Sequence, residues 1–247
     1  MILEPVRLRS AAEHIADRLV TAIALGEFVP GQRLPTERDM AAMLGVSRTT
    51  VREAIHRLSA LGHVEVRRGR NGGTFVISDA GPEATEMIRR TLLPEWERFE
   101  RLFDFRQLIE PLIARVAAER RTDQDVPVIR DILQAYVDAG DREASRAADE
   151  ALHATIARAT HNPYLVALSA SIRGEISLGF GAEPYSSQIR ARAVGDHGAL
   201  ADAVIGGDPE RALEVARKHF AITESVLREL HGRIERIEAD SGEELTR

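Results

Sequence analysis

The sequence predicts a mainly α-helical protein with two domains: an N-terminal winged helix-turn-helix with a small β-hairpin wing, and a C-terminal all-α bundle of about seven helices. Residues 10–61 contain three segments with helical apolar spacing, and residues 64–77 contain two alternating segments around a glycine-rich loop. Beyond residue 82 only helical periods remain. We therefore predict domains at 1–78 and 79–247, joined by a short polar linker at 78–82.

The first two helices are predicted from their starting residues. Residues 10–25 have helical apolar spacing with Ser10 as a cap, and a Pro-Gly turn follows shortly afterwards. Thr36 begins the sequence T-E-R-D, which has the form of a capping box. A second helix should therefore run from this threonine to Leu44.

A tight turn, G-V-S, separates the second helix from a third. Ser47 caps the third helix, which should end at Leu61-Gly62. Alternating residues at 64–66 and 74–77 flank the loop R-R-G-R-N-G-G. Two short strands joined by such a loop predict the hairpin wing.

Composition excludes several kinds of protein. There is no cysteine, so disulfides, a thiolate nucleophile and cysteine-ligated zinc are all excluded. The N-terminus lacks a basic-then-apolar signal pattern and no apolar run approaches the length of a membrane span, so we expect a cytoplasmic protein. Residues 1–78 carry a net charge of +3 and residues 79–247 one of −9. A basic module attached to an acidic one suggests nucleic-acid binding by the N-terminal part.

The third predicted helix presents arginines beside its apolar arc. That arc, which must face a core, consists of Val51, Ala54, Ile55, Leu58 and Leu61. Arg48, Thr49 and Arg52 lie on a neighbouring arc at the N-terminal end, which is the end that enters the major groove in this motif. Arginine forks match guanine O6 and N7, whereas threonine suits thymine or phosphate. These three residues therefore predict DNA binding.

Two further groups could support that contact. Arg38, near the start of the second helix, could reach the groove edge or a phosphate. In the wing, Arg67, Arg68 and Arg70 accompany glycines that let the backbone approach a duplex, which predicts phosphate or minor-groove contact.

The run from L-P-T-E-R-D-M-A through V-S-R-T-T-V-R-E-A-I-H-R-L to G-G-T-F-V resembles the DNA-binding domain of the GntR family of bacterial transcription regulators. The resemblance covers residues 33–76 without a break. It implies that DNA is contacted by Arg38, Ser47, Arg48, Thr49, Arg52, Arg68 and Gly69.

Seven helices are predicted beyond the linker. Their ranges are 83–93, 96–121 with a kink near Pro111, 123–139, 141–160, 163–180, 185–206 and 209–238. The charged tail from Asp240 is expected to fray.

Polar residues occupy apolar faces of three of these helices. His197 and His219 each lie among apolar neighbours, and Asp149 and His153 project together at i and i+4. A buried polar group needs a partner, and one metal ion would satisfy all four. A lone histidine on an apolar face is more often an ordinary core residue, but two of them with an inward Asp-His pair favour a metal.

The sequences D-E-A-L-H (149–153), D-H (196–197), K-H-F (218–220) and R-Q-L-I-E-P (106–111) resemble the ligand-binding bundle of the FadR branch of the GntR family. The resemblance implies that Asp149, His153, His197 and His219 hold a divalent ion. Zinc suits such a set, and nickel, manganese and iron are alternatives. By contrast, the histidines predicted to lie at the surface or at caps are His14, His63, His161 and His231.

Two buried-face arginines are candidates for binding a carboxylate. Arg106 lies among apolar residues of its helix, where it either pairs with Glu110 one turn on or clamps an effector carboxylate. The resemblance favours the clamp. Arg173 is placed similarly, and Arg190, on the face of His197, is a third candidate.

Three functions are compatible with these features. The first is a transcription regulator that is not an enzyme: a homodimer binds an inverted repeat, and a small organic acid at the metal changes its DNA affinity. The resemblance implies sugar acids or short hydroxy or keto acids. The second is a metal-free regulator of the same kind that responds to a long acyl chain. The third is a metalloenzyme with a DNA-binding appendage, which would need a second inward carboxylate or another base near the histidines.

Overall fold

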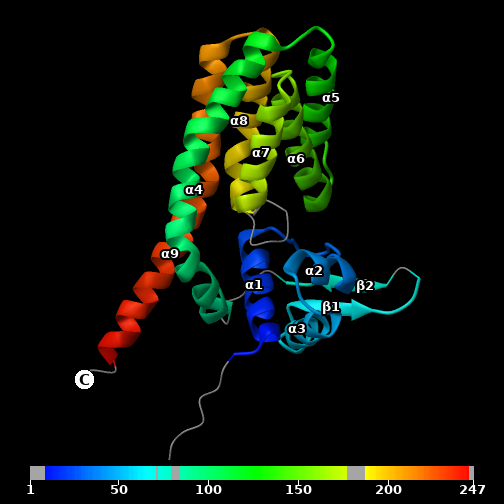
Figure 1. Cartoon of the computed structure of the whole chain (residues 1–247), viewed down its shortest axis with the longest axis vertical. Coiled ribbons are helices and arrows are strands. Elements are labelled where there is room, and N and C mark those ends of the chain that lie inside the picture. The colour runs from blue at the N-terminus through cyan, green and yellow to red at the C-terminus, as the bar shows by residue number, and fades with distance from the viewer. Residues whose placement is uncertain (1–8, 71, 79–83, 177–186, 245–247) are drawn as a thin grey trace, which may run out of the picture. The chain divides into compact units, whose positions relative to one another are not determined.

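The structure, a computed structural model, describes residues 9–70, 72–78, 84–176 and 187–244 (Figure 1). The chain divides into two compact units, one made of Met1–Ala24 with Phe28–Pro94 and the other of Leu25–Glu27 with Glu95–Arg247. All of the predicted linker except Ser78 lies outside the described residues. The domain boundary after residue 78 therefore stays a prediction.

The N-terminal unit is a winged helix-turn-helix, as predicted. Its elements, coloured blue to cyan in Figure 1, are α1 Ala11–Leu25, α2 Glu37–Leu44, α3 Arg48–Ala60, β1 Val64–Arg67 and β2 Gly73–Val76. The strands pair antiparallel, with Val64 opposite Val76 and Arg67 opposite Gly73.

The predicted caps set the turn between α2 and α3. Thr36 Oγ1 accepts a hydrogen bond from the backbone N–H of Asp39 at 3.2 Å, and Ser47 Oγ accepts one from that of Thr50 at 3.1 Å. Gly45 ends α2 with φ 65°, in the left-handed region that glycine adopts without strain. These residues terminate one helix and start the next within three positions.

Packing follows the predicted apolar arc of α3 except at its end. The buried members of the arc are Val51, Ala54, Ile55 and Leu58. Leu61, predicted to belong to the same arc, is 54% exposed. The helix ends at Ala60 and Leu61 is its C-cap, so the helical period no longer governs where this side chain points.

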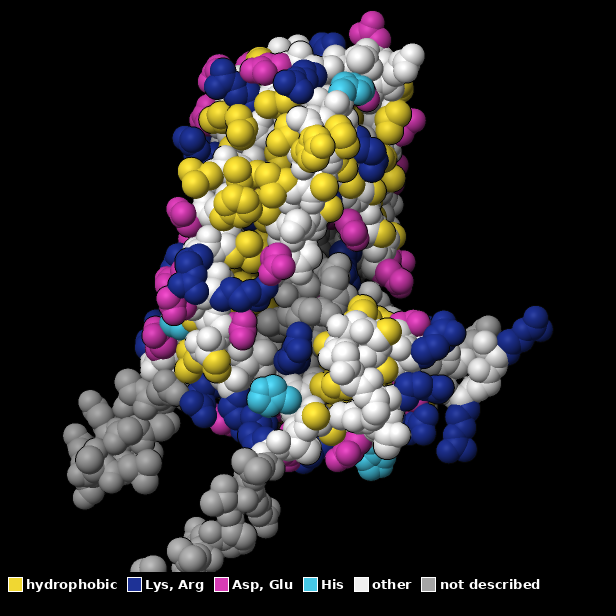
Figure 2. Space-filling model, viewed as in Figure 1, with side chains coloured by type: hydrophobic (Ala, Val, Ile, Leu, Met, Phe, Trp, Pro, Cys, Tyr) yellow, Lys and Arg dark blue, Asp and Glu magenta, His cyan; other side chains and the backbone are white. Residues whose placement is uncertain are grey.

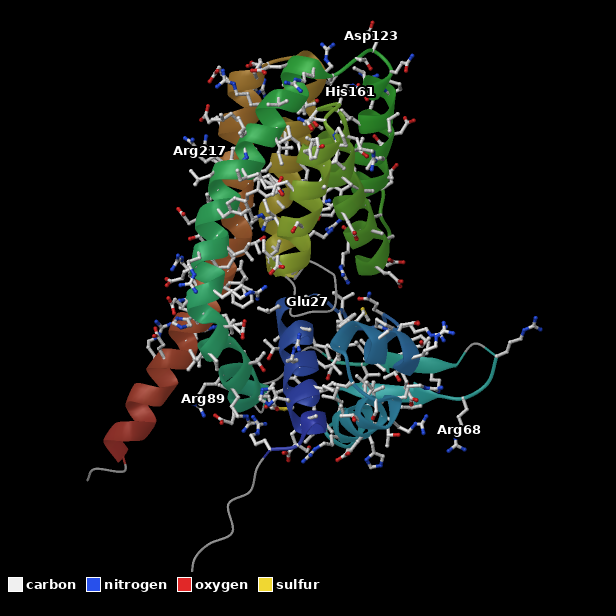
Figure 3. The ribbon with its side chains drawn as sticks, viewed as in Figure 1. Glu27, Arg68, Arg89, Asp123, His161 and Arg217 are labelled. Atoms are coloured by element: carbon white, nitrogen blue, oxygen red, sulfur yellow. The ribbon has the colours of Figure 1, made fainter. Side chains whose placement is uncertain are left out.

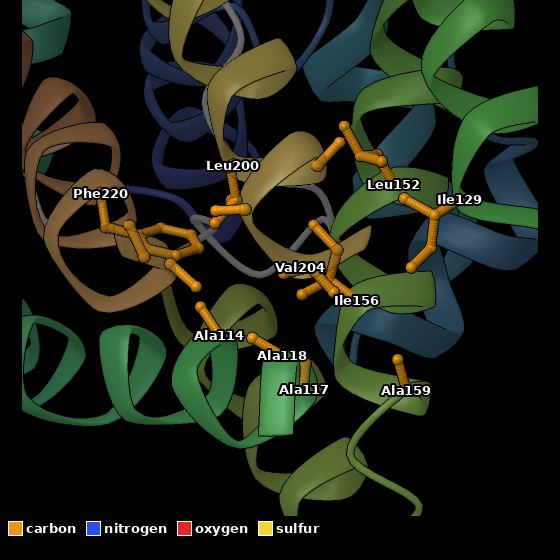
Figure 4. Packing of buried hydrophobic residues seen from close by; sticks show 14 residues of the cluster. Ala114, Ala117, Ala118, Ile129, Leu152, Ile156, Ala159, Leu200, Val204 and Phe220 are labelled. Carbon is orange, nitrogen blue, oxygen red and sulfur yellow. The ribbon is translucent and has the colours of Figure 1, made fainter. Parts of the chain in front are cut away.

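The remaining helices are α4 Thr85–Arg120, α5 Asp125–Val137, α6 Arg142–Arg158, α7 Pro163–Ile176, α8 Ser187–Gly206 and α9 Pro209–Glu244. Within the C-terminal unit, α5 to α9 and the part of α4 after Pro94 form an all-helical bundle. Its core joins α4, α5, α6, α8 and α9 through small and branched residues, among them Ala117, Ile129, Leu152, Val204 and Phe220 (Figure 4). None of the helices in the described ranges combines the length and apolar character needed to cross a membrane.

Two predicted helix limits were wrong. The segments 83–93 and 96–121 form the single helix α4, so the described residues beyond position 84 hold six helices where seven were expected. Pro94 removes one backbone donor, but Leu92 before it and Phe99 after it are buried, so packing on both sides supports the helix. Helix α9 continues to Glu244, past the predicted end at 238, and the predicted last residues of α7 lie outside the described residues.

Candidate functional site

The N-terminal end of α3 presents its polar side chains to solvent. The side chains of Arg48 and Arg52 are each 62% exposed, and Thr49 is exposed beside them. Arg38 on α2 is 79% exposed and donates to Asp39 Oδ1 at 3.3 Å. These side chains are accessible to a ligand as large as a duplex.

The wing extends a second basic surface. Figure 2 shows dark-blue basic side chains gathered over the hairpin end of the N-terminal unit, and Figure 3 shows Arg68 pointing away from the strands. Arg67 is held at the strand end, 3.1 Å from Glu65 and 4.4 Å from the centre of the Phe75 ring. Gly69 has φ 106°, where any other residue would be strained. The loop is therefore shaped to present Arg68.

A second group of candidates meets inside the C-terminal unit. Helix α6 contributes Asp149 and His153, α8 contributes His197 and α9 contributes His219. His153 Nε2 lies 3.2 Å from His197 Nε2 and 3.1 Å from His219 Nε2. The Asp149 carboxylate lies 3.1 Å from His197 Nε2 and 3.9 Å from His153 Nε2. The four residues predicted from sequence are therefore adjacent, with the three imidazoles forming the centre.

Burial favours the neutral form of two of these imidazoles, those of His153 and His219. His197 is fully buried, His153 is 6% exposed and His219 is 7% exposed. Burial lowers the pKa of His153 and of His219 well below the usual histidine value, and His197 and Arg106 lower both further. His219 and Arg173 add to the effect on His153. The neutral imidazole is favoured, which is the form that binds a metal.

The three imidazoles fit a metal ion. Nδ1 of His197 and Nδ1 of His219 are buried without a hydrogen-bond partner among the described residues, so the polar contacts of these rings fall on the Nε2 side. Two metal–nitrogen bonds of about 2.1 Å place their nitrogens about 3.0–3.4 Å apart at angles between square and tetrahedral. The observed separations of 3.1 and 3.2 Å lie in that range. The candidate nitrogens of all three histidines lie within 4.8 Å of one another.

Arg106 and Arg173 both lie close enough to the histidine cluster for their charges to lower the pKa of His153. Arg106 is 2% exposed and its guanidinium lies 4.7 Å from the centre of the Phe220 ring, next to His219 in sequence. Arg173 Nη1 donates to Ser169 Oγ at 2.7 Å, and that hydroxyl donates to Glu110 Oε1 at 3.0 Å. The third candidate, Arg190, donates to Ser145 Oγ at 2.7 Å.

Three buried polar neighbours of the histidines or of the candidate arginines were missed from sequence. Tyr136 of α5 is 1% exposed and meets the His197 ring edge-on at 4.6 Å. Ser145 and Ser169 are each 1% exposed beside the candidate arginines. A serine or tyrosine within a helical apolar period is common in any core, so only their shared position distinguishes them.

The histidines outside the cluster differ in their exposure to solvent. His161 is exposed, as predicted, and lies 2.8 Å from Asp125 Oδ2 (Figure 3 labels it). For His63, predicted to lie at the surface or at a cap, the surface alternative was wrong: it is 7% exposed because it directly precedes the buried start of β1. Its backbone N–H donates to the Leu58 carbonyl at 3.0 Å at the end of α3, in keeping with the cap alternative. The surface alternative was also wrong for His231, whose side chain is 13% exposed and stacks on Trp96 with ring centres 3.9 Å apart.

Comparison with known proteins identifies both parts of the chain. Residues 11–76 match the model of bacterial regulatory proteins of the gntR family, and residues 101–222 match the FCD domain. The HTH-type transcriptional regulator Mce2R of Mycobacterium tuberculosis is 30% identical over 236 residues, covering 88% of this chain and 91% of that protein. The chain belongs to the GntR family. Its FCD domain marks the FadR-like branch, so the chain is a DNA-binding transcription regulator and not an enzyme.

Two other GntR relatives carry informative names. The Uxu operon transcriptional regulator of Escherichia coli is 40% identical over 148 residues, covering 57% of this chain and 55% of that protein. Another Escherichia coli protein, whose name assigns it to regulation of the L-lactate dehydrogenase operon, is 28% identical over 261 residues and covers 98% of this chain and 97% of its own length.

Proposed function

We propose that this GntR regulator senses a small organic acid at a divalent metal site in its FCD domain and changes its operator affinity in response. The observation that carries the proposal is the convergence of three buried imidazoles near two arginines, with His153 Nε2 lying 3.2 Å from His197 Nε2 and 3.1 Å from His219 Nε2. A short hydroxy or keto acid, or a sugar acid, has the carboxylate that such a pocket would take. The L-lactate dehydrogenase operon named for one relative supports the short hydroxy-acid class.

His153, His197 and His219, with Asp149 alongside, would hold the ion, and a bound divalent ion would supply an open coordination position for a carboxylate. Zinc, nickel, manganese and iron all accept such ligands. Burial lowers the pKa of His153 and of His219 and so favours their neutral form. The three histidines come from α6, α8 and α9, so an ion bound by them would tie these helices together at one point.

Arg106 and Arg173 would bind the acid. A buried guanidinium can donate two parallel hydrogen bonds to a carboxylate, and both arginines are close enough to His153 to lower its pKa. Ser169 holds Arg173 against Glu110 and so fixes one of the two guanidinium groups. The acid would then contact residues of α4 and α7 as well as the histidine helices.

We expect Arg106→Ala to keep metal binding and DNA binding but to lose the effect of the acid. The measurement is operator affinity of metal-loaded protein during titration with a panel of hydroxy, keto and sugar acids. Removing a charge-assisted bidentate contact should weaken the response about tenfold or more. Arg101→Ala, on the exposed face of the same helix, should respond as the wild type does.

Two results would contradict these roles. If Arg106→Ala lowers the melting temperature but keeps the full response to the acid, Arg106 pairs with Glu110 and does not bind the acid. If no acid changes the operator affinity of metal-loaded wild-type protein, while a long acyl ligand does so without metal, the metal-free alternative holds.

We also propose that the protein acts as a homodimer on an inverted repeat, through the outer face of α4 and α7. Exposed apolar side chains lie at i, i+3 and i+7 on α4: Phe105, Leu108 and Leu112. The hydrogen bonds from α7 to Glu110 and from Arg98 to the Glu175 carbonyl at 2.9 Å align α7 antiparallel beside α4. Figure 2 shows yellow side chains gathered over these helices.

The neighbouring face of α7 is lined by small exposed residues: Ala167, Ala170, Ser171 and Gly174. Bulky side chains on one helix and small ones on its neighbour are self-complementary under a two-fold axis, because each α4 can pack on the α7 of a second copy. A second copy of this chain is therefore the occupant that fits.

Leu108→Glu should make the protein monomeric, because the side chain is 64% exposed at the centre of this face and a buried unpaired carboxylate opposes association. Sedimentation velocity measures the mass, and affinity for the full inverted repeat should fall while half-site binding stays. Val137→Glu, 60% exposed on α5, is the matched control. A dimeric Leu108→Glu protein would rule out this face.

A further inference from the structure

A carboxylate at the first position of α2 holds both arginines of the α3 N-terminus. Glu37 Oε1 accepts a hydrogen bond from Arg52 Nε at 3.0 Å, and Glu37 Oε2 accepts one from Arg52 Nη2 at 2.7 Å. The same Oε2 lies 3.9 Å from Arg48 Nη2. The Glu37 side chain is 27% exposed, whereas both arginine side chains are 62% exposed.

This ion pair is present at neutral pH. The hydrogen bond from Arg52 lowers the pKa of Glu37, and the charges of both arginines lower it further against a burial effect that raises it. The same contact raises the pKa of Arg52. Exposed ion pairs contribute little to folding stability, so the pair has little to do with holding α2 against α3.

We propose that Glu37 is a positioning residue that sets the sequence specificity of this regulator by orienting Arg52, and more weakly Arg48, for base contact. The inference rests on the proposed groove-reading role of the two arginines. The carboxylate engages the Nε and Nη2 atoms of the guanidinium. The Nη1 side of the planar fork, which no described hydrogen bond engages, stays available to a guanine.

Glu37 has two physical effects on DNA binding. Arginine has many rotamers, and holding the fork in one plane before binding reduces the entropy lost when it contacts a base. The negative charge of Glu37 also repels phosphates, which weakens binding to DNA of any sequence. Only the first effect depends on sequence, so Glu37 should raise the ratio of operator affinity to non-specific affinity by orienting Arg52, while its charge lowers both affinities together.

The test uses the full chain and two DNA probes: a duplex enriched by the wild-type protein from a random-sequence library, and a random duplex of equal length. Glu37→Gln should raise non-specific affinity about two- to fivefold and lower the affinity ratio at least about fivefold. Glu37→Asp keeps the charge but shortens the reach, so it should lower the ratio without changing non-specific affinity. The melting temperature of each variant should stay close to that of the wild type.

Glu53→Gln is the matched control. Glu53 is exposed on α3 and joined to no arginine by an ion pair within the described residues, so its loss changes the charge equally. Non-specific affinity should rise as it does for Glu37→Gln, but the base preferences should not change. An equal fall of the ratio in both variants would show that only charge matters and would overturn the proposal.

A double-mutant cycle separates positioning from direct reading, since a glutamate can itself accept a hydrogen bond from cytosine. If Glu37 acts through Arg52, the ratio of operator affinity to non-specific affinity should fall no further in the double variant Glu37→Gln/Arg52→Ala than in Arg52→Ala alone. Additive losses would mean that Glu37 reads DNA itself and would overturn the inference. If Arg52→Ala alone leaves the ratio unchanged, the groove assignment has failed, whatever Glu37 does.

Discussion

Replacing His197 with alanine should leave the purified protein with little bound metal. The side chain is fully buried and its Nε2 faces both His153 Nε2 and the Asp149 carboxylate, so its loss removes one nitrogen from the centre of the cluster. Loss of an outer-shell partner alone costs roughly 10–100-fold in metal affinity, and loss of a ligand should cost more. Elemental analysis and competition with a chelator measure the effect. His219→Ala should behave in the same way.

Loss of the metal should also lower the stability of the protein and abolish its response to the acid. Metal bound to the folded state adds about 2.7 kcal/mol when its concentration is 100 times the dissociation constant, so chelation should lower the melting temperature of the wild type but not of His197→Ala. The acid should lose its effect on operator affinity, because it loses a ligating partner. DNA binding itself should remain, since the proposed groove residues lie in the N-terminal unit.

His161→Ala provides the comparison. This imidazole is exposed and contacts Asp125, on a different helix from any proposed ligand. Its removal should leave metal content and response unchanged. Equal, near-stoichiometric metal in all three variants, or none in carefully loaded wild-type protein, would show that the cluster is not a metal site.

The second large effect is expected at the start of α3. Arg48→Ala and Arg52→Ala should each weaken operator binding by about 1–3 kcal/mol and reduce the preference for one base pair. Each removes a guanidinium group that can donate two hydrogen bonds to guanine. Arg68→Ala, in the wing, should weaken binding more evenly across sequences and reduce its salt dependence. Operator titrations at several salt concentrations separate the two kinds of loss.

Arg57→Ala is the control within the same helix. Arg57 is 43% exposed, but it pairs with Glu13 of α1 and lies away from the α3 N-terminus. Its loss should leave the base preference intact. If Arg48→Ala and Arg52→Ala titrate as the wild type does, the major-groove assignment is wrong.

Much of the N-terminal unit could be predicted because its signals are local. Thr36, Gly45 and Ser47 act on backbone groups within a few positions of themselves, so the limits of α2 and α3 were predicted to within about one residue. The hairpin followed from alternation on either side of a glycine-rich loop. The errors lie where local rules end: Leu61 leaves the helical period at a C-cap, and His63 is buried beside β1.

The histidine cluster was predictable for a related reason. Asp149 and His153 share a helix face by their spacing, and His197 and His219 each interrupt an apolar face, so periodicity alone points all four inward. Periodicity does not say whether three inward faces meet. The resemblance to the FadR branch supplied that expectation, and the approach of His197 Nε2 and His219 Nε2 to within 3.2 Å and 3.1 Å of His153 Nε2 is a fact of tertiary structure.

By itself, then, the sequence determined the two-part organisation, the caps and turns of the winged unit, and which polar side chains would face a core, because each depends on contacts within a few residues or on helical period. Tertiary structure decided the rest. It continued α4 through Pro94, placed Tyr136 against His197 and Ser169 between Arg173 and Glu110, and set Glu37 against Arg52 from fifteen positions away. These outcomes depend on which surfaces pack together in three dimensions, and no local pattern encodes that choice.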